Sequence, residues 1–110
     1  MTQDPAELRG VPLIASRLVE YGEGAIVSRT ILQRESGNVT LFAFDAGQGL
    51  SEHTAPFDAL VLVLDGRAAI TIGGQVNEVA AGGVVIMPAR VPHAVKAIER
   101  FKMMLVMIRG

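Results

Sequence analysis

The chain contains no cysteine, and this absence excludes disulfide-bonded scaffolds and metal sites built on thiolates. The longest uninterrupted apolar runs, near residues 60–64 and 103–108, are far too short to span a bilayer. The first ten residues, MTQDPAELRG, carry acids and a proline where a secretory signal needs a basic start and an apolar stretch. We therefore expect a soluble, cytoplasmic protein that does not bind membranes.

An excess of charge of either sign is also missing, since the net charge is −1. Residues 1–89 hold five basic and ten acidic side chains, whereas residues 90–110 hold five basic and one acidic. This basic end could attract an anion or a phosphate backbone. Its charges alternate with apolar residues, however, as on a strand with one solvated face, and no aromatic platform for bases accompanies them. We expect no binding to nucleic acid.

The chain has 110 residues, half of them hydrophobic, which predicts a single domain over residues 1–110 with residues 1–12 as an N-terminal extension. Pro5 after Asp4 favours a short helical turn at residues 4–10. Asp65-Gly66 predicts a hairpin between two strands, and Gly73-Gly74 predicts another turn. A period of two predicts strands at residues 13–20, 25–33, 38–45, 60–64, 68–72, 76–79, 84–87, 94–98 and 102–108. This pattern is typical of an all-β sandwich or closed barrel.

Several predicted strands are apolar on both faces, notably LVLVL at residues 60–64 and MMLVMI at residues 103–108. An antiparallel strand with one face in water alternates between apolar and polar residues instead. Burial on both faces in so small a protein predicts that a partner subunit covers the outside, and we expect a homodimer. The alternative is that the N-terminal segment covers this face.

The two histidines lie in two similar segments. The first segment runs from Gly47 to Gly66 and carries His53, and the second runs from residue 82 to His93 with Pro88 between. Two histidines that point inward from neighbouring strands of a narrow barrel converge on one point. Imidazole is a ligand for zinc, iron, copper, nickel and manganese. The pair is therefore a candidate binding, catalytic or metal site.

These segments resemble the two motifs of the cupin superfamily, G-x5-H-x-H-x3-4-E-x6-G and G-x5-P-x-G-x2-H-x3-N. The resemblance covers about residues 38–108 and is to small, single-domain, RmlC-like cupins. It implies a double-stranded β-helix, or jelly-roll barrel, with antiparallel strands in two facing sheets and a pocket at one end.

The chain departs from the family at the metal site, which takes three histidines and one carboxylate. Ala55 stands where the second histidine belongs and Ala59 where the glutamate belongs, which leaves His53 and His93 as metal ligands. We expect at most a weakly held divalent transition metal and, in preference, no cofactor. The two alanines also predict a larger and drier cavity that favours an apolar or mixed small molecule.

The predicted ligand pocket comprises His53, Ala55, Ala59, His93 and Arg90. Both histidines are candidate catalytic residues, since neutral imidazoles can act as general base or acid. The alternative is that they bond to each other, to water or to a ligand. Arg90, in the position where the family has glycine, either reaches the pocket mouth to hold an anion or is a solvated turn residue.

Asp58 and the methionines are further candidates for the site. A bulge near Pro56 could turn Asp58 into the cavity, although a regular pleat points it outward. Methionines 87, 103, 104 and 107 are interpreted as adaptable packing rather than as a copper site.

Three functions fit these residues. We prefer a cupin that binds a small organic molecule inside the barrel. The second is an enzyme, either an isomerase or lyase that transfers protons through the histidines, or a metal-dependent, dioxygenase-like cupin. The third is a ligand-sensing module that acts through a partner, since no helix-turn-helix is evident.

Overall fold

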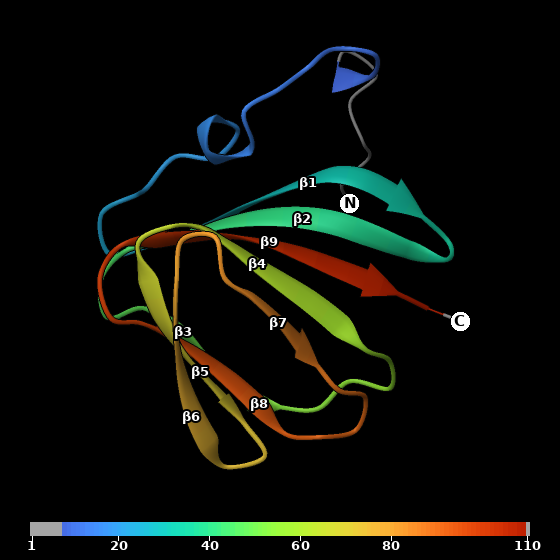
Figure 1. Ribbon diagram of the computed structural model, residues 1–110. Coiled ribbons are helices and arrows are strands. Elements are labelled where there is room, and N and C mark those ends of the chain that lie inside the picture. The colour runs from blue at the N-terminus through green and yellow to red at the C-terminus, as the bar shows by residue number, and fades with distance from the viewer. Residues whose placement is uncertain (1–7, 110) are drawn as a thin grey trace.

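The computed structural model describes residues 8–109 and consists of nine strands and one short 3-10 helix, η2, at Ala15–Arg17 (Figure 1). The strands are β1 (Ile26–Arg34), β2 (Gly37–Phe44), β3 (Gly49–His53), β4 (Ala59–Asp65), β5 (Arg67–Ile72), β6 (Gln75–Ala80), β7 (Val84–Met87), β8 (His93–Ala97) and β9 (Phe101–Ile108).

The strands form two antiparallel sheets that face each other. One has the order β1-β2-β9-β4-β7 and the other the order β3-β8-β5-β6. The main core fills the space between them and includes the stacked rings of Phe44 and Phe101, with centroids 4.6 Å apart. The predicted all-β jelly-roll barrel of two facing sheets is confirmed.

Strand β4 shows how the apolar pattern builds this arrangement. Its alternate residues Ala59, Val61 and Val63 are buried in the core between the sheets, while the leucines between them face outward and are only partly covered. A strand with apolar residues on both faces therefore needs cover on the outside as well.

The N-terminal segment provides part of that cover. The prediction of a strand at residues 13–20 is wrong, because this stretch contains the 3-10 turn and pairs with no strand. Val19 packs on Leu41 and Ala43 of β2, on the outer face of the larger sheet. Two side chains also bind the backbone of this segment, since Lys102 donates to the Ser16 carbonyl at 2.7 Å and Arg29 donates to the Leu18 carbonyl at 3.1 Å.

Strand β3 was missed by the sequence analysis, which predicted no strand at residues 49–53. It lies at the edge of the smaller sheet, pairs only with β8, and is mostly exposed. An edge strand with little apolar surface lacks the alternating pattern by which strands are predicted.

The predicted hairpin at Asp65-Gly66 is also wrong. Strand β4 pairs with β7 and β9, whereas β5 pairs with β6 and β8, so the chain crosses from one sheet to the other at Gly66. Gly66 has a φ of 74°, and a Cβ there would lie 1.8 Å from the carbonyl oxygen of Arg100. Glycine is needed here because the backbone passes close to the Arg100 carbonyl, and not because residues 65 and 66 form a hairpin turn. The turn at Gly73-Gly74 does join two paired strands, β5 and β6, with positive φ at both residues.

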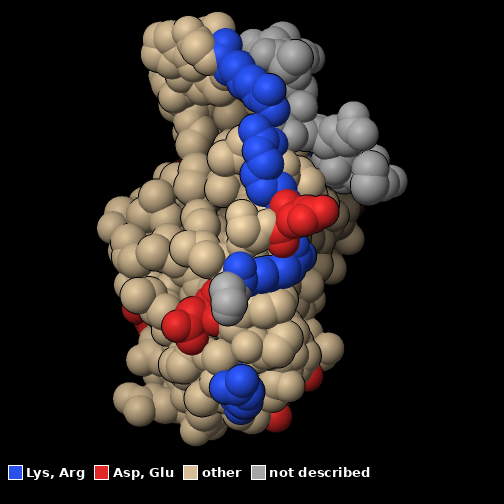
Figure 2. Space-filling model, turned by 90° about the vertical axis from the view of Figure 1, so that its right-hand side faces the viewer, with Lys and Arg blue, Asp and Glu red and all other residues tan. Residues whose placement is uncertain are grey.

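The described surface carries both apolar and charged areas. Ile86 is 58% exposed on the edge strand β7, and Ile108 is 67% exposed at the end of the central strand β9. Figure 2 shows a line of Lys and Arg side chains with acidic ones beside it, and a broad area with almost no charge to its left. Within residues 8–109, none of the helices has the length and hydropathy to cross a membrane. The helical turn predicted at residues 4–10 lies largely outside the described residues, and a cytoplasmic location stays a prediction.

Candidate functional site

The two histidines meet inside the barrel. His53 on β3 and His93 on β8 are direct partners across the smaller sheet. Their Nε2 atoms are 3.1 Å apart, and their rings lie edge to face with centroids 4.4 Å apart. His93 is 3% exposed, whereas His53 is exposed. The convergence expected from the sequence is therefore present, with one ring buried and the other open to solvent.

A β-bulge in β3 turns His53 toward the interior. Leu50 pairs with Val95 and His53 pairs with His93, so three steps along β3 match two steps along β8. In a regular strand, residues three apart point to opposite faces. The extra residue lets both Leu50 and His53 face the barrel interior, where both line the same cavity.

Two hydrogen bonds join the loops that carry the histidines. The backbone amide of Ala89 donates to Asp58 Oδ1 at 2.7 Å, and the amide of Arg90 donates to the Ala55 carbonyl at 2.8 Å. Asp58 is exposed and does not line the barrel cavity, so no bulge near Pro56 turns it inward. Its carboxylate instead links the β3–β4 and β7–β8 loops.

The hydrogen bonds of the two rings define their tautomers. His53 Nδ1 lies 2.8 Å from the Ser51 carbonyl oxygen, and His93 Nδ1 lies 3.2 Å from the Val91 carbonyl oxygen. A carbonyl oxygen only accepts, so both Nδ1 atoms donate. In two neutral rings of this tautomer neither Nε2 carries a hydrogen, and the two nitrogen atoms lie 3.1 Å apart. The two nitrogen atoms are therefore close enough to share a proton or to bind one cation.

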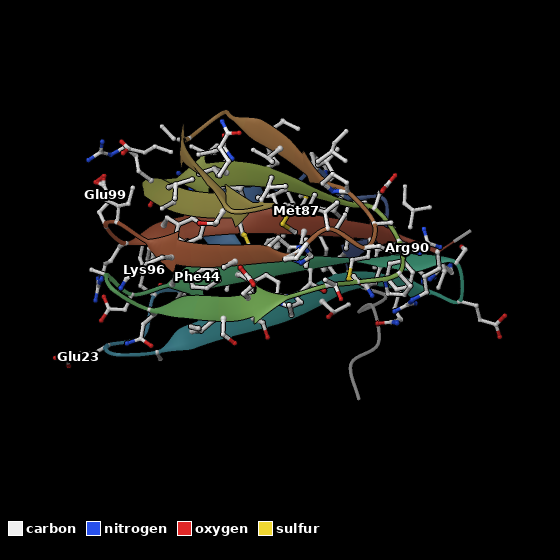
Figure 3. The ribbon with its side chains drawn as sticks, turned by 90° about the horizontal axis from the view of Figure 1, so that it is seen from below. Glu23, Phe44, Met87, Arg90, Lys96 and Glu99 are labelled. Carbon is white, nitrogen blue, oxygen red and sulfur yellow. The ribbon has the colours of Figure 1, made fainter. Side chains whose placement is uncertain are left out.

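The cavity next to the pair has a volume of about 60 Å³. Its lining comprises Leu50, His53, Ala55, Ala59, Met87, His93, Val95, Met103, Leu105 and Met107. Such a volume corresponds to roughly two water molecules at about 30 Å³ each. The wall is apolar apart from the two histidines, and methionine side chains from β7 and β9 form part of it. Figure 3 shows Met87 within the barrel.

Four of the five residues predicted for the ligand pocket line this cavity, namely His53, Ala55, Ala59 and His93. Arg90 is not among the lining residues. It is exposed and has a φ of 64°, the left-handed conformation for which the family motif has glycine. Figure 3 places it at one end of the barrel.

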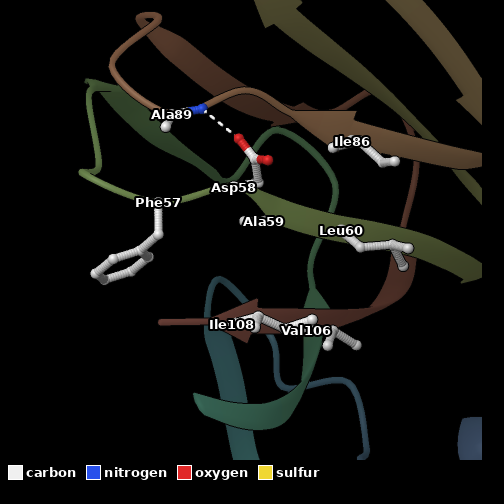
Figure 4. Close-up of a pocket in the computed structure, with 8 residues that line it drawn as sticks. All are labelled: Phe57, Asp58, Ala59, Leu60, Ile86, Ala89, Val106 and Ile108. Carbon is white, nitrogen blue, oxygen red and sulfur yellow. Dashed lines mark hydrogen bonds between the residues drawn. The ribbon is translucent and has the colours of Figure 1, made fainter. Parts of the chain in front are cut away.

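A second hollow lies outside the barrel and was not expected from the sequence. It has a volume of about 500 Å³ and is shown in Figure 4. Its wall is mainly apolar and comprises Phe57, Asp58, Ala59, Leu60, Ile86, Ala89, Val106 and Ile108. Only the order of β7, β4 and β9 brings these residues together. Leu60 and Val106 are direct partners there, 46 positions apart in the chain, which no local sequence pattern indicates.

Two facing antiparallel sheets with a histidine pair at the end of the interior define a jelly-roll barrel protein of the cupin class. Residues 40–109 match the family described as Cupin domain, and the chain belongs to this family. A conserved protein of unknown function from Streptococcus pyogenes is similar in structure, with a TM-score of 0.91 and 35% identity over 100% of this chain and 96% of that one. A cupin superfamily protein from Desulfitobacterium hafniense has a TM-score of 0.88 and 29% identity over 99% and 97% of the two chains.

In sequence, an uncharacterized protein from Streptomyces coelicolor is 42% identical over 62 residues, which cover 56% of this chain. The match spans 59% of that relative's length.

The four-ligand divalent metal site that the resemblance implies does not fit the residues present. Among residues 8–109, no group of three or more His, Cys, Asp and Glu side chains is placed to hold a metal ion. The cavity offers two imidazoles and no carboxylate. The cavity therefore lacks the ligands for the divalent metal that an oxygenase of this family uses.

Proposed function

We propose that this cupin binds a small organic acid at the barrel end, with the Nε2 atoms of His53 and His93 as the recognition element. The observation that carries the proposal is the 3.1 Å contact between the Nε2 atoms of the two rings. The other nitrogen of each ring, Nδ1, donates to a backbone carbonyl, which leaves Nε2 available to a ligand. When an acid transfers its proton to this pair, the pair carries a single positive charge beside the carboxylate.

The surroundings of the pair support an anionic ligand. The other residues that line the cavity are apolar, and none of them carries a charge. A positive charge against an apolar wall is stabilised by an anion that accepts a hydrogen bond from it. With a cavity of about 60 Å³, only the few atoms nearest the carboxylate enter, and the rest of the ligand lies outside beside the exposed His53.

The same pair has the chemistry for proton transfer, as an isomerase or lyase needs. A catalyst, however, must also enclose the carbon from which a proton is taken, and the cavity leaves room for few atoms beyond the carboxylate. Binding is therefore the function that the geometry supports best.

A thermal-shift comparison of matched ligands tests the proposal. In chelator-treated protein we expect acetate and pyruvate to raise the melting temperature, while acetamide, the neutral counterpart of acetate, does not. A ligand at ten times its Kd stabilises by about 1.4 kcal/mol, which is several degrees for a domain of this size. His53→Ala, at an exposed position, is expected to abolish the shift. A shift that survives His53→Ala, or none with any carboxylate, contradicts the proposal.

We also propose that a second copy of the chain covers the outer face beside the groove of Figure 4. Strand β7 is an edge strand of the larger sheet, and its sequence VVIM carries no charge or proline to protect the edge. Ile86 on β7 and Ile108 on β9 are exposed, and both line this groove. The N-terminal segment covers residues of β2, but neither isoleucine belongs to that cluster.

Light scattering after size exclusion tests this dimer. We expect a dimeric mass at micromolar concentration and a monomeric mass for Ile86→Glu. Val76→Glu is the matched control, since Val76 is equally exposed but lies on β6 of the other sheet. A monomeric wild-type protein, or a dimer that both variants retain, would overturn the proposal.

A further inference from the structure

The register of the larger sheet places two methionines beside Ala59. On one side Ala59 pairs with Met87 of β7, and on the other it pairs with Met107 of β9. Residues that pair directly across antiparallel strands point to the same face of the sheet. All three line the cavity that contains His53 and His93. The slot from which the family supplies a carboxylate is therefore flanked by two thioethers.

The histidines and the methionines come from opposite sheets. His53 and His93 are partners in the smaller sheet, while the methionines belong to the larger one. Met87 is buried and Met107 is partly buried. The two imidazoles of the smaller sheet and the thioether side chains of the larger one, Met103 included, thus line one space of about 60 Å³, which has room for a single ion.

We propose that this cavity binds one Cu(I) ion through Nε2 of His53, Nε2 of His93 and the Sδ atoms of Met87 and Met107. Thioether ligands select Cu(I) among the metals available to proteins, and imidazole binds copper well. Two nitrogens that each lie roughly 2.0–2.1 Å from one metal ion are about 3 Å apart when they bind at nearly a right angle. The observed separation of 3.1 Å fits this geometry without movement of either ring.

The contacts behind the rings support the same assignment. Each Nδ1 donates to a backbone carbonyl, of Ser51 for His53 and of Val91 for His93. Such bonds orient a metal-binding imidazole and direct its Nε2 lone pair to the ion. The two Nε2 lone pairs then converge on one cation rather than repel each other.

Charge distinguishes Cu(I) from the divalent ions. The residues lining the cavity include no carboxylate, so every donor in it is neutral. Burying an ion without an anionic partner is costly, and the cost rises steeply with its charge. Cu(I) carries a single charge and binds neutral sulfur and nitrogen ligands. Zinc or iron in the divalent state would lack an anionic ligand here.

The sequence alone did not reveal this site. In the sequence the methionines indicate only packing, because nothing in their spacing shows that Met87 and Met107 share a row with Ala59. The copper site uses the same histidine pair as the proposed function, and it rests on that proposal in one respect: a ligand from solvent must be able to reach the pair. Each can fail separately, since acetate binding is measured without metal and copper binding without a carboxylate.

Anaerobic titration with Cu(I) against the chelator bathocuproine disulfonate tests the inference in the full chain. We expect the wild-type protein to retain one Cu(I) per chain in competition. The double variant Met87→Leu/Met107→Leu keeps similar side-chain volumes and removes both sulfurs. It is expected to bind Cu(I) at least tenfold more weakly. Met104→Leu is the matched control on the outer face and is expected to bind like the wild type.

X-ray absorption at the copper edge provides a second measurement that does not depend on the folding of the variants. Sulfur and nitrogen neighbours of copper in the wild-type protein would support the site. Nitrogen neighbours alone would overturn it, as would wild-type affinity in the double variant or no retention of Cu(I) by the wild-type protein. If the double variant does not fold, the single variant Met107→Leu, at a partly exposed position, takes its place. It too is expected to bind Cu(I) at least tenfold more weakly than the wild-type protein.

Discussion

Asp58 accepts a hydrogen bond of 2.7 Å from the backbone amide of Ala89, across 31 positions of the chain. The bond joins the loop that follows His53 to the loop that precedes His93. Together with the bond from the Arg90 amide to the Ala55 carbonyl, it holds the two loops side by side. An exposed carboxylate outside the cavity thus helps to position both rings inside it.

We therefore predict that Asp58→Ala lowers the free energy of unfolding by about 1–2 kcal/mol, because a backbone amide loses a charged acceptor. It is also expected to weaken acetate binding, since the loops on which the rings depend come apart. Urea denaturation and the acetate-induced thermal shift measure the two effects. Glu52→Ala, at an exposed position in β3, is the control and should change neither. Equal effects of the two substitutions would contradict this role of Asp58.

Arg90 adopts a φ of 64°, which is unfavourable for a residue with a Cβ. Arg90→Gly is expected to stabilise the protein by about 1 kcal/mol, the usual cost of a left-handed residue. Arg90→Ala retains the Cβ and should give no such gain, which separates backbone strain from loss of the guanidinium. Chemical denaturation of the three proteins decides the question. A gain from alanine equal to that from glycine would show that the side chain, not the backbone, is responsible.

Asp45 is predicted to make the protein sensitive to acid. Its carboxylate accepts bonds from Arg100 Nε at 2.8 Å and from the amides of Gly24 and Ala46 at 2.6 and 2.9 Å. The Arg100 guanidinium, followed by the two amides, lowers the pKa of Asp45 to about 2 from 3.8. Because the folded-state pKa is the lower one, the stabilisation is complete above pH 3.8 and is lost as the pH falls toward about 2.

The measurement is the melting temperature between pH 5 and pH 2, where we expect a shallower decline for Asp45→Asn than for the wild-type protein. Glu35→Gln, in the exposed turn between β1 and β2, is the control and should decline like the wild type. Identical slopes for the wild type and Asp45→Asn would be evidence against the prediction.

Tyr21 attaches the N-terminal segment to the sheet by donating to Asp65 Oδ2 at 2.5 Å. Burial first, and then the bond and charge of Asp65, raise the pKa of Tyr21 well above its ordinary value of 10.0. Because the folded-state pKa is the higher one, its contribution to stability is complete below pH 10 and declines as the pH rises further.

The chain has a single tyrosine and no tryptophan, so tyrosinate absorbance reports this residue alone. We expect the folded protein to show no tyrosinate at a pH where the urea-unfolded chain is half ionised. Asp65→Asn should move the titration of the folded protein toward that of the unfolded chain. Coincident titrations of the folded wild-type and unfolded chains would contradict the attachment.

The parts of the fold that could be predicted are those marked in the sequence by a local apolar pattern or by a motif of fixed spacing. The apolar run of β4 indicated a strand that is covered on both faces. The spacing of Gly47, Gly66, Gly82 and Pro88 around the histidines indicated the barrel and the meeting of His53 with His93. The bulge in β3 has no such signal, because residues 49–53 are mostly exposed and follow no apolar pattern. The prediction of a strand at residues 13–20 was wrong because the sequence does not distinguish a segment that packs on the face of a sheet from a strand that pairs within the sheet.

The identity of the cavity wall depended on register, which sequence does not show. Ala59 lies next to Met87 and Met107 only because β4 is placed between β7 and β9, and these pairings join residues 28 and 48 positions apart. A one-residue slip of either partner would turn its methionine to the outside. The volume left by Ala55 and Ala59 could not be estimated without knowing that these side chains occupy part of it.

Strand β9 lies at the centre of the five-stranded sheet, between β2 and β4, although it is the last strand in the chain. During synthesis, β2 and β4 therefore remain without their shared neighbour until residues 101–108 have left the ribosome. Until then the apolar edges of both strands are open to other nascent chains, which makes this the stage at which a chaperone would matter most. Because so many pairings join distant residues, we expect refolding in milliseconds to seconds rather than microseconds.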